Sequence, residues 1–186
     1  ASNRQYFRLS DDETSCVGVL GVNPDENRTF IAMAAHFRAQ RIAVPEVYAV
    51  SEDAMAYIQE DLGDTALFGI VGSEGSEELL CRTVRCLPDI QFKGADGFDF
   101  SVCHSVCRVD RRLVLVDLNY FKYCFLKPSG LEFDENRLQD DFERLADDLT
   151  SVKTDTFMYR DFNARNVMIK DGAPCFIDFQ GGMQGP

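Results

Sequence analysis

The sequence predicts an α+β fold in two parts, a small strand-rich lobe at about 1–60 and a mostly helical lobe at 61–186. Three observations support this division. Short alternating and β-branched segments dominate the first part, a polar break containing a glycine follows at 60–64, and helical periodicity dominates beyond it. The 186 residues allow one domain or two closely packed lobes, at roughly 150 residues per domain.

The first lobe is expected to open with a β-hairpin. Residues 5–10 alternate in polarity, residues 11–14 form a polar turn, and residues 16–20 are apolar and β-branched. Two further strands are predicted at 47–50 and at 55–59. Together these segments predict a small sheet.

One helix interrupts the strands. Asn23 is a candidate N-cap, Pro24 suits the first helical turn, and the acidic Asp25 and Glu26 favour the positive end of the helix dipole. Apolar residues then recur at helical spacing, so the helix is expected to run to about Gln40.

The second lobe is expected to be helical in its first two thirds. Helical periodicity covers four segments, at 67–71, 77–87, 113–125 and 138–149. Short strands return at 157–159, 166–170 and 174–179. The Asp171-Gly172 pair between the last two strands is typical of a tight hairpin turn. An aromatic patch on the third helix, at Tyr120, Phe121 and Phe125, is expected to pack in the core of this lobe.

Composition and charge exclude several classes of protein. The net charge of −12 argues against binding to a phosphate backbone, so no nucleic acid is expected as a partner. No run of 18 apolar residues could span a membrane. The first eight residues lack the apolar core of a signal peptide, so we expect a cytoplasmic protein.

The seven cysteines fit that compartment. Their number is odd, and no C-x-x-C pair occurs, so reduced thiols are expected. The Cys103-His104-x-x-Cys107 segment suggests zinc, but it offers only three ligands. We therefore expect both cysteines to be small buried hydrophobes.

The chemistry-bearing residues lie in the last thirty positions. Asp161 and Asn166 are five apart across a tight loop, and Asp178 follows the partner strand of the predicted hairpin. This order can direct two carboxylates and one amide oxygen towards one point. Phosphoryl transfer from ATP requires such a set: one carboxylate orients the acceptor hydroxyl, and the other two groups hold Mg²⁺ on the phosphates. Each residue alone would more simply cap a turn or end a strand.

These residues resemble the catalytic and metal-binding segments of protein-kinase-like small-molecule kinases. The Asp161-x4-Asn166 spacing with Ile177-Asp178-Phe179 is similar to the aminoglycoside phosphotransferase and choline kinase families, including bacterial amino-sugar kinases. The segment 2–9 resembles the phosphate-covering hairpin of the sugar-kinase branch, and the segment 59–63 resembles the family hinge. Those enzymes commonly read His-Gly-Asp where this chain has Tyr159-Arg160-Asp161.

The resemblance implies a role for each matching position. Asp161 would be the catalytic base, or the group that orients the acceptor hydroxyl. Asn166 and Asp178 would be Mg²⁺ ligands. The backbone near Glu60 and Leu62 would receive the adenine of ATP, between the two lobes.

Two departures from the family affect this interpretation. The family pairs a strand lysine with a helix glutamate at the ATP phosphates, but no lysine precedes Lys93 here. Arg4 or Arg8 could supply the charge, or both could be solvated strand residues. Without the lysine, Glu26 is expected to act only as a first-turn acid. The chain also begins inside the expected phosphate loop and stops soon after the metal segment, so a fragment, an incomplete chain or a shortened relative is expected.

The predicted activity is ATP- and Mg²⁺-dependent phosphorylation of a hydroxyl on a small polar molecule. A sugar or amino sugar is the favoured acceptor, ahead of an aminoglycoside or a choline-like molecule. Asp117 or Asn119 could contact the acceptor, and Arg160 could stabilise negative charge beside Asp161. The alternative is a nucleotide-binding or regulatory kinase-like module that does not catalyse.

Overall fold

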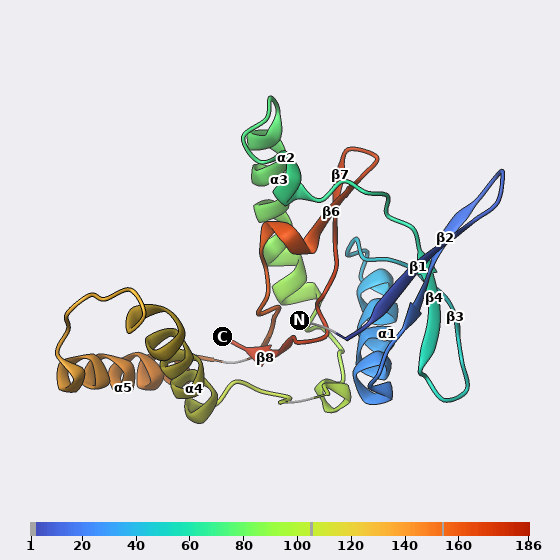
Figure 1. Ribbon diagram of the computed structural model, residues 1–186. Helices are drawn as coiled ribbons and strands as arrows, with labels where there is room; N and C mark the ends of the chain where they lie inside the picture. The colour runs from blue at the N-terminus through green and yellow to red at the C-terminus, as the bar shows by residue number, and fades with distance from the viewer. Residues whose placement is uncertain (1–2, 105, 154) are drawn as a thin grey trace.

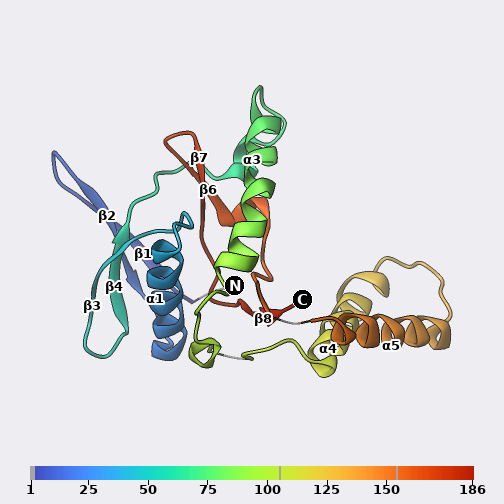
Figure 2. The same ribbon diagram turned by 180° about the vertical axis from the view of Figure 1, so that it is seen from behind.

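The computed structural model describes residues 3–104, 106–153 and 155–186 (Figure 1). Ser2, the first residue of the expected phosphate-covering hairpin, lies outside the described residues. The structure has a sheet with one helix at its N-terminal end, and helices with two small hairpin-like sheets beyond it (Figures 1 and 2). This is the α+β arrangement that the sequence predicts.

The N-terminal sheet has four antiparallel strands in the order β1-β2-β4-β3. Their bounds are Gln5–Ser10 for β1, Ser15–Leu20 for β2, Ala56–Glu60 for β4 and Val47–Val50 for β3. In the register, Tyr6 lies opposite Val19, and Val19 lies opposite Tyr57. Because side chains alternate along a strand, these three residues share the face that is turned towards helix α1.

Helix α1 (Pro24–Ala39) begins as the sequence predicts. The Asn23 side chain accepts hydrogen bonds from the backbone N–H groups of Asp25 and Glu26, and Pro24 occupies the first turn. The helix packs on the sheet through Phe30, whose ring stacks on Tyr57 with 5.3 Å between centroids. This packing fixes Glu26, one turn earlier, close to the inner face of the sheet.

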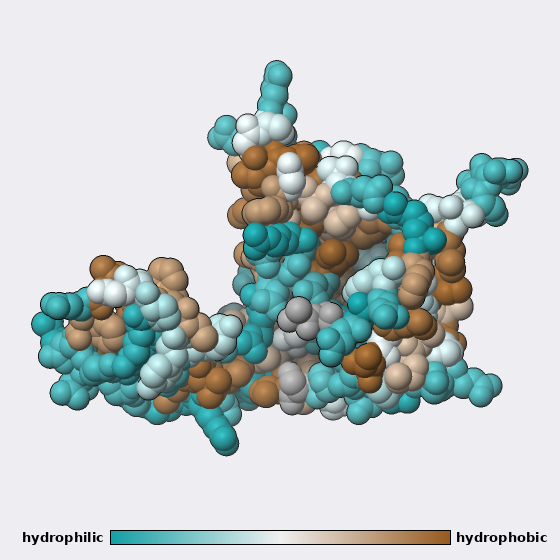
Figure 3. Space-filling view, in the orientation of Figure 1, coloured by the Kyte–Doolittle hydropathy of each residue, from teal (hydrophilic) through white to brown (hydrophobic). Residues whose placement is uncertain are grey.

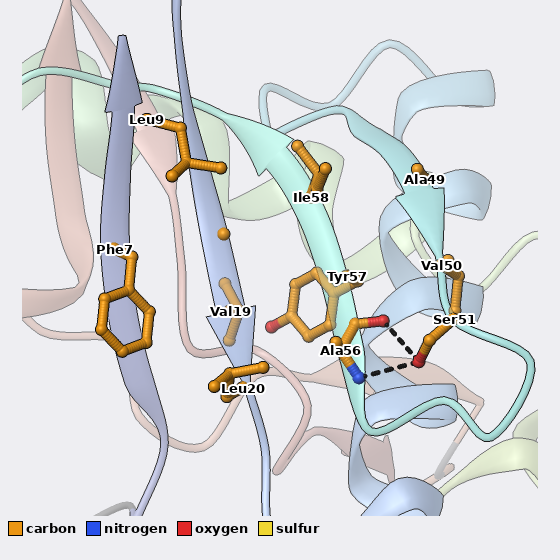
Figure 4. Close-up of a pocket in the computed structure, with 11 residues that line it drawn as sticks. Phe7, Leu9, Val19, Leu20, Ala49, Val50, Ser51, Ala56, Tyr57 and Ile58 are labelled. Atoms are coloured by element: carbon orange, nitrogen blue, oxygen red, sulfur yellow. Dashed lines mark hydrogen bonds between the residues drawn. The ribbon is translucent and has the colours of Figure 1, made fainter.

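No helix among the described residues covers the outer face of the sheet. Phe7, Leu9, Leu20 and Ile58 line a shallow hollow of about 420 Å³ there (Figure 4). Its lining has no charged side chain, so this hollow offers none of the groups that phosphoryl transfer requires.

The rest of the chain is built from helices and two short strand pairs. The helices are α2 (Leu67–Ile70), α3 (Ser76–Pro88), α4 (Arg111–Phe121) and α5 (Glu135–Ser151). Strand β6 (Val167–Lys170) pairs with β7 (Ala173–Phe176) through the expected turn. Strand β5 (Thr156–Met158) pairs with β8 (Met183–Gly185), a strand that the sequence pattern did not indicate.

An aromatic cluster joins the N-terminal helix to the C-terminal segments. The Phe179 ring stacks on Phe30 at 5.0 Å and meets Phe37 edge-on at 5.3 Å, while Phe37 meets Phe157 edge-on at 4.8 Å. Phe37, Phe157 and Phe179 are fully buried. Because Phe179 follows Asp178 directly, this core anchors the segment that carries the predicted metal ligand.

Helices α4 and α5 stand apart from the remainder of the molecule (Figures 1 to 3). The prediction that Tyr120, Phe121 and Phe125 pack in a core is therefore wrong. These three residues are 70%, 43% and 61% exposed, respectively. The helical spacing of these aromatics is that of a buried face, but no other described element covers them.

Two further sequence expectations can be compared with the structure. Cys103 is buried as expected, whereas Cys107 is exposed, so the prediction is wrong for Cys107. Within the described ranges, no group of three or more His, Cys, Asp or Glu side chains is placed to hold a metal ion. None of the helices formed by these residues combines the length and apolarity needed to cross a membrane.

Candidate active site

The candidate site is a cavity of about 290 Å³ between the inner face of the N-terminal sheet and the segment after β7. Asn166 and Asp178 both line it, so the structure brings together the two residues expected to hold a metal. Arg4, Gln59 and Gln180 supply further polar groups. Carboxylate and amide oxygens are ligands that Mg²⁺ prefers, and the remaining positions around Mg²⁺ usually belong to water and phosphate.

Local hydrogen bonds shape the loop that presents Asn166. The Asn163 side chain accepts from the Arg165 N–H and begins the short 3-10 turn Ala164–Asn166. The Asn166 Nδ2 group donates to the Asp161 carbonyl oxygen at 2.9 Å. Since this bond uses the amide nitrogen, Oδ1 is the atom that Asn166 can offer to a cation.

Asp161 does not line the cavity, but its backbone is hydrogen-bonded to Asn166, which does. Its carbonyl oxygen accepts from Asn163 as well as from Asn166. A Cβ placed on Gly181 would lie 3.7 Å from Asp161 Oδ2, so the carboxyl group lies beside the segment that follows Asp178. The structure therefore gathers Asp161, Asn166 and Asp178 in one region, as their spacing predicts.

Two hydrogen bonds connect the loop that carries Asp161 to the segment that carries Asp178. The Ile177 N–H donates to the Asn166 carbonyl oxygen at 3.0 Å, and the Tyr159 hydroxyl donates to the Ile177 carbonyl oxygen. Burial raises the pKa of Tyr159 well above its usual value, so this phenol stays protonated and remains a donor. Asp178 itself has a φ of 63°, a left-handed conformation that is uncommon outside glycine.

Arg4 is the cation of the cavity. Its Nη2 lies 3.0 Å from Glu26 Oε1, and its side chain is only 4% exposed. This pairing corrects the expectation that Glu26 is merely a first-turn acid. The sequence showed both residues, but only the packing of α1 under the sheet places the helix carboxylate beside Arg4.

Arg8 is engaged elsewhere. Its Nε donates to Asp61 Oδ2 at 2.7 Å, and its Nη2 donates to Asp64 Oδ1 at 2.8 Å. These hydrogen bonds, first that to Asp64 and then that to Asp61, raise the pKa of Arg8, and Arg8 does not line the cavity. Arg8 therefore ties β1 to the segment after β4, and Arg4 alone of the two expected arginines faces the candidate site.

Glu60 and Leu62 do not line this cavity either. The Glu60 N–H donates to the Glu46 carbonyl oxygen at 2.8 Å, and the Glu60 carboxylate pairs with Lys170 of β6. Leu62 is buried. Gln59, the neighbour of Glu60 on β4, does line the cavity, as does Tyr57 of the same strand.

Gln180 is the residue that sequence reasoning missed. It is 9% exposed, and its Nε2 donates to Asp178 Oδ1 at 2.7 Å. The available signal was its place two positions after Asp178, whose carboxylate is flanked by two apolar residues, Ile177 and the buried Phe179.

The fold and this site define a class: a protein-kinase-like α+β fold of the aminoglycoside phosphotransferase type. The chain matches the crystal structure of aminoglycoside phosphotransferase APH(4)-Ia with a TM-score of 0.68 and 15% identity, over 100% of this chain and 66% of that one. A thermostable mutant of the same enzyme, in a ternary complex with AMP-PNP and hygromycin B, matches with a TM-score of 0.63 and 15% identity, over 97% of this chain and 68% of that one.

Sequence comparison points to a particular kind of protein within that class. The chain is 27% identical over 198 aligned positions to the N-acetylmuramate/N-acetylglucosamine kinase of Neisseria meningitidis, covering 100% of this chain and 56% of the relative. It is 25% identical to the kinase of the same name from Pseudomonas aeruginosa, covering 100% of this chain and 54% of the relative. The chain thus spans about half the length of the curated relatives it matches. No protein-family model matches it. These relatives confirm the resemblance to the amino-sugar kinase branch.

Proposed function

We propose that this protein is an ATP- and Mg²⁺-dependent kinase that phosphorylates a hydroxyl of a sugar or amino sugar. One observation carries the proposal: Asn166, Asp178 and Arg4 line a single cavity, and Asp161 is hydrogen-bonded to its edge through Asn166. The lobes at about 1–60 and 61–186 would hold the nucleotide between them. The names of the curated relatives support the amino-sugar acceptor.

Arg4 is proposed to bind the phosphates. Its guanidinium is buried and is oriented by Glu26, in the way that the family pairs a lysine with a helix glutamate. Arginine suits this role because its planar guanidinium can form two parallel hydrogen bonds to a phosphate group. The adenine would lie against the backbone near Glu60 and Leu62, with Gln59 closer to the phosphates.

The residues present fit a magnesium ion. Asn166 Oδ1 and the Asp178 carboxylate would hold it, and the ion would neutralise charge on the phosphates. Asp161 would accept a hydrogen bond from the acceptor hydroxyl and orient it for attack. Positioning and charge neutralisation supply most of the catalysis in phosphoryl transfer, so a single oriented carboxylate is sufficient.

A second hollow supports the acceptor assignment. It has a volume of about 230 Å³ and is lined by residues of α4, α5 and β5, and by Arg160. Asp117 is among the α4 residues. Arg160 Nη2 lies 2.6 Å from Asp117 Oδ2, and Arg160 immediately precedes Asp161. A polar pair beside an apolar wall, next to the proposed base, suits a sugar that carries hydroxyl groups and an apolar face.

The proposal is tested by measuring ATP consumption with Mg²⁺ over a panel of sugars, amino sugars, aminoglycosides and choline. The protein at its full natural length is compared with its Asp178→Ala variant and with a control, Asp140→Ala, that removes an exposed acid on α5. We expect turnover with an amino sugar that falls by at least 100-fold in Asp178→Ala and persists in Asp140→Ala. Nucleotide binding without transfer to any acceptor would instead indicate the non-catalytic module.

The state of the cysteines leads us to propose the cytoplasm as the location of this protein. All seven cysteines lie in the described ranges and are free thiols.

A further inference from the structure

Gln180 connects two parts of the candidate site that are distant in sequence. Its Nε2 donates to Asp178 Oδ1 at 2.7 Å and also approaches Glu26 Oε1 at 3.4 Å. Glu26 Oε1 in turn accepts the ion pair from Arg4. One amide therefore links the proposed metal ligand to the proposed phosphate-binding pair.

The orientation of this amide is fixed by its neighbours. Both groups near Nε2 are carboxylate oxygens, which only accept hydrogen bonds, so the opposite orientation would place Oε1 against two negative charges. The amide oxygen is consequently turned away from them. Gln180 Oε1 is buried, lacks a hydrogen-bond partner within the described part of the chain, and belongs to a residue that lines the cavity.

A buried carbonyl oxygen without a hydrogen-bond donor costs free energy. A hydrogen-bond donor inside the cavity would remove that cost. Water bound to Mg²⁺ is such a donor, and the Asp178 carboxylate that would hold the ion is already hydrogen-bonded to the same amide.

On the basis of the proposed function, we propose that Gln180 is a positioning residue for the magnesium site. Its N–H group holds Asp178 Oδ1, which leaves Oδ2 for the cation, and its Oε1 accepts a hydrogen bond from water on that cation. Partners of this kind, which orient a metal ligand without touching the metal, commonly change metal affinity by 10–100-fold when removed.

The contact with Glu26 gives the same residue a second consequence. Gln180 contacts the carboxylates of both Glu26 and Asp178. It therefore fixes the position of the Arg4–Glu26 pair relative to Asp178. Binding of the cation at Asp178 and binding of phosphate at Arg4 are then coupled through a single side chain.

The test measures the affinity of a fluorescent ADP analogue over a titration of Mg²⁺, with EDTA as the metal-free reference. Gln180→Met keeps the length of the side chain but removes both polar atoms of the amide. In this variant, we expect the Mg²⁺ concentration that gives half of the maximal change in nucleotide affinity to rise about tenfold. Metal-free nucleotide affinity should change less than twofold. In Gln180→Glu, an oxygen still faces the cation. Metal-free nucleotide binding should therefore weaken, and the increase in nucleotide affinity that Mg²⁺ causes should become larger.

Gln59→Met is the matched control. Gln59 lines the same cavity and its Oε1 is also buried without a hydrogen-bond partner among the described residues, but no hydrogen bond joins it to Asp178 or Glu26 there. We expect this variant to change nucleotide affinity by the same factor with and without Mg²⁺.

The outcomes separate the inference from the function on which it rests. A shift of less than twofold in Mg²⁺ dependence in the Gln180 variants that fold, with normal nucleotide binding in the unchanged protein, would overturn the inference alone. Failure of the unchanged protein to bind nucleotide at any Mg²⁺ concentration would overturn the proposed function together with it. The two substitutions change Mg²⁺ dependence in opposite directions, so either one suffices if the other does not fold.

Discussion

At the scale of single residues, the site depends on side chains whose surroundings restrict them to one orientation. The Asn166 Nδ2 group donates a hydrogen bond to the Asp161 carbonyl oxygen, which leaves Oδ1 for the cavity. Arg160 and Asp178 both have positive φ angles, of 67° and 63°. Non-glycine residues in this region cost free energy. Of these two residues, Asp178 lines the cavity and Arg160 directly precedes the proposed base Asp161.

Asp161→Asn tests the proposed base. The amide keeps the size of the side chain but cannot accept the hydroxyl proton, so turnover should fall by at least 100-fold. Nucleotide affinity, measured by fluorescence titration, should change less than twofold, because Asp161 does not line the cavity that holds Arg4 and Asp178. Full turnover in this variant would remove Asp161 from the role.

Arg4→Ala tests the proposed phosphate contact. We expect the KM for ATP to rise severalfold, because the buried guanidinium is lost and Glu26 remains without its cation. Arg4→Lys should recover part of the affinity. Arg28→Ala, which removes an exposed arginine from the same helix that carries Glu26, is the control and should leave the KM unchanged. Equal KM values in all three variants would contradict the assignment.

At the scale of elements, the N-terminus of α1 and the end of β4 fix the geometry of the site. Helix α1 carries Glu26 in its first turn, so its capping determines where that carboxylate lies. Glu60 at the end of β4 is paired with Lys170 on β6, and this pair joins the sheet to the C-terminal hairpin.

Asn23→Ala is expected to lower the free energy of unfolding by about 1 kcal/mol, because two N–H groups of the first turn of α1 lose their acceptor. Asn23→Asp keeps a side-chain oxygen as the acceptor and should lie within a few tenths of a kcal/mol of the unchanged protein. Urea denaturation followed by circular dichroism measures both. Equal losses in the two variants would show that the cap does not contribute.

The Glu60–Lys170 pair is tested by a double-mutant cycle with Glu60→Gln and Lys170→Met. Because both side chains are partly exposed, we expect a coupling of about 0.5–1 kcal/mol at neutral pH. Partial burial, the largest single effect, raises the pKa of Glu60. The hydrogen bonds from Lys170 and the Glu46 N–H, with the charges of Lys170 and Arg38, together outweigh it, so the net pKa is lowered. The coupling should therefore be complete above the ordinary pKa of a glutamate and should disappear as the pH falls through the lowered value. A coupling that does not weaken as the pH is lowered through the acid range would contradict this account.

At the scale of the whole molecule, burial separates the seven cysteines into classes. Cys81, Cys107 and Cys124 are exposed, whereas Cys103 and Cys175 are buried. Burial raises the pKa of the Cys103 thiol to about 11 and that of Cys175 to about 12. Since the thiolate is the reactive form, both buried thiols should be unreactive near neutral pH.

We therefore expect iodoacetamide at pH 8 to modify the three exposed cysteines first and to leave Cys103 and Cys175 intact in the folded protein. Timed alkylation followed by peptide mass spectrometry measures the order. In denaturant, all seven should react. Modification of Cys175 at the same rate as Cys81 would show that β7 is not packed as described.

Local sequence signals were sufficient for most of the fold. The cap at Asn23, the turn at Asp171-Gly172 and the helical periodicities each act within a few residues, so each could be predicted from neighbouring positions. Strand β8 could not, because its three residues form a strand only by pairing with β5, which lies more than twenty positions earlier.

The sequence by itself determined the identities and spacing of Asp161, Asn166 and Asp178, because a loop and a tight hairpin bring them together locally. Tertiary structure alone decided that Arg4 rather than Arg8 faces the cavity, that Glu26 is its partner, and that Gln180 joins both to Asp178. It also decided that the aromatic residues of α4 are exposed. The physical reason is the same in each case: these contacts join segments far apart in the chain, and their partners are fixed only when the helix, the sheet and the aromatic core pack against one another.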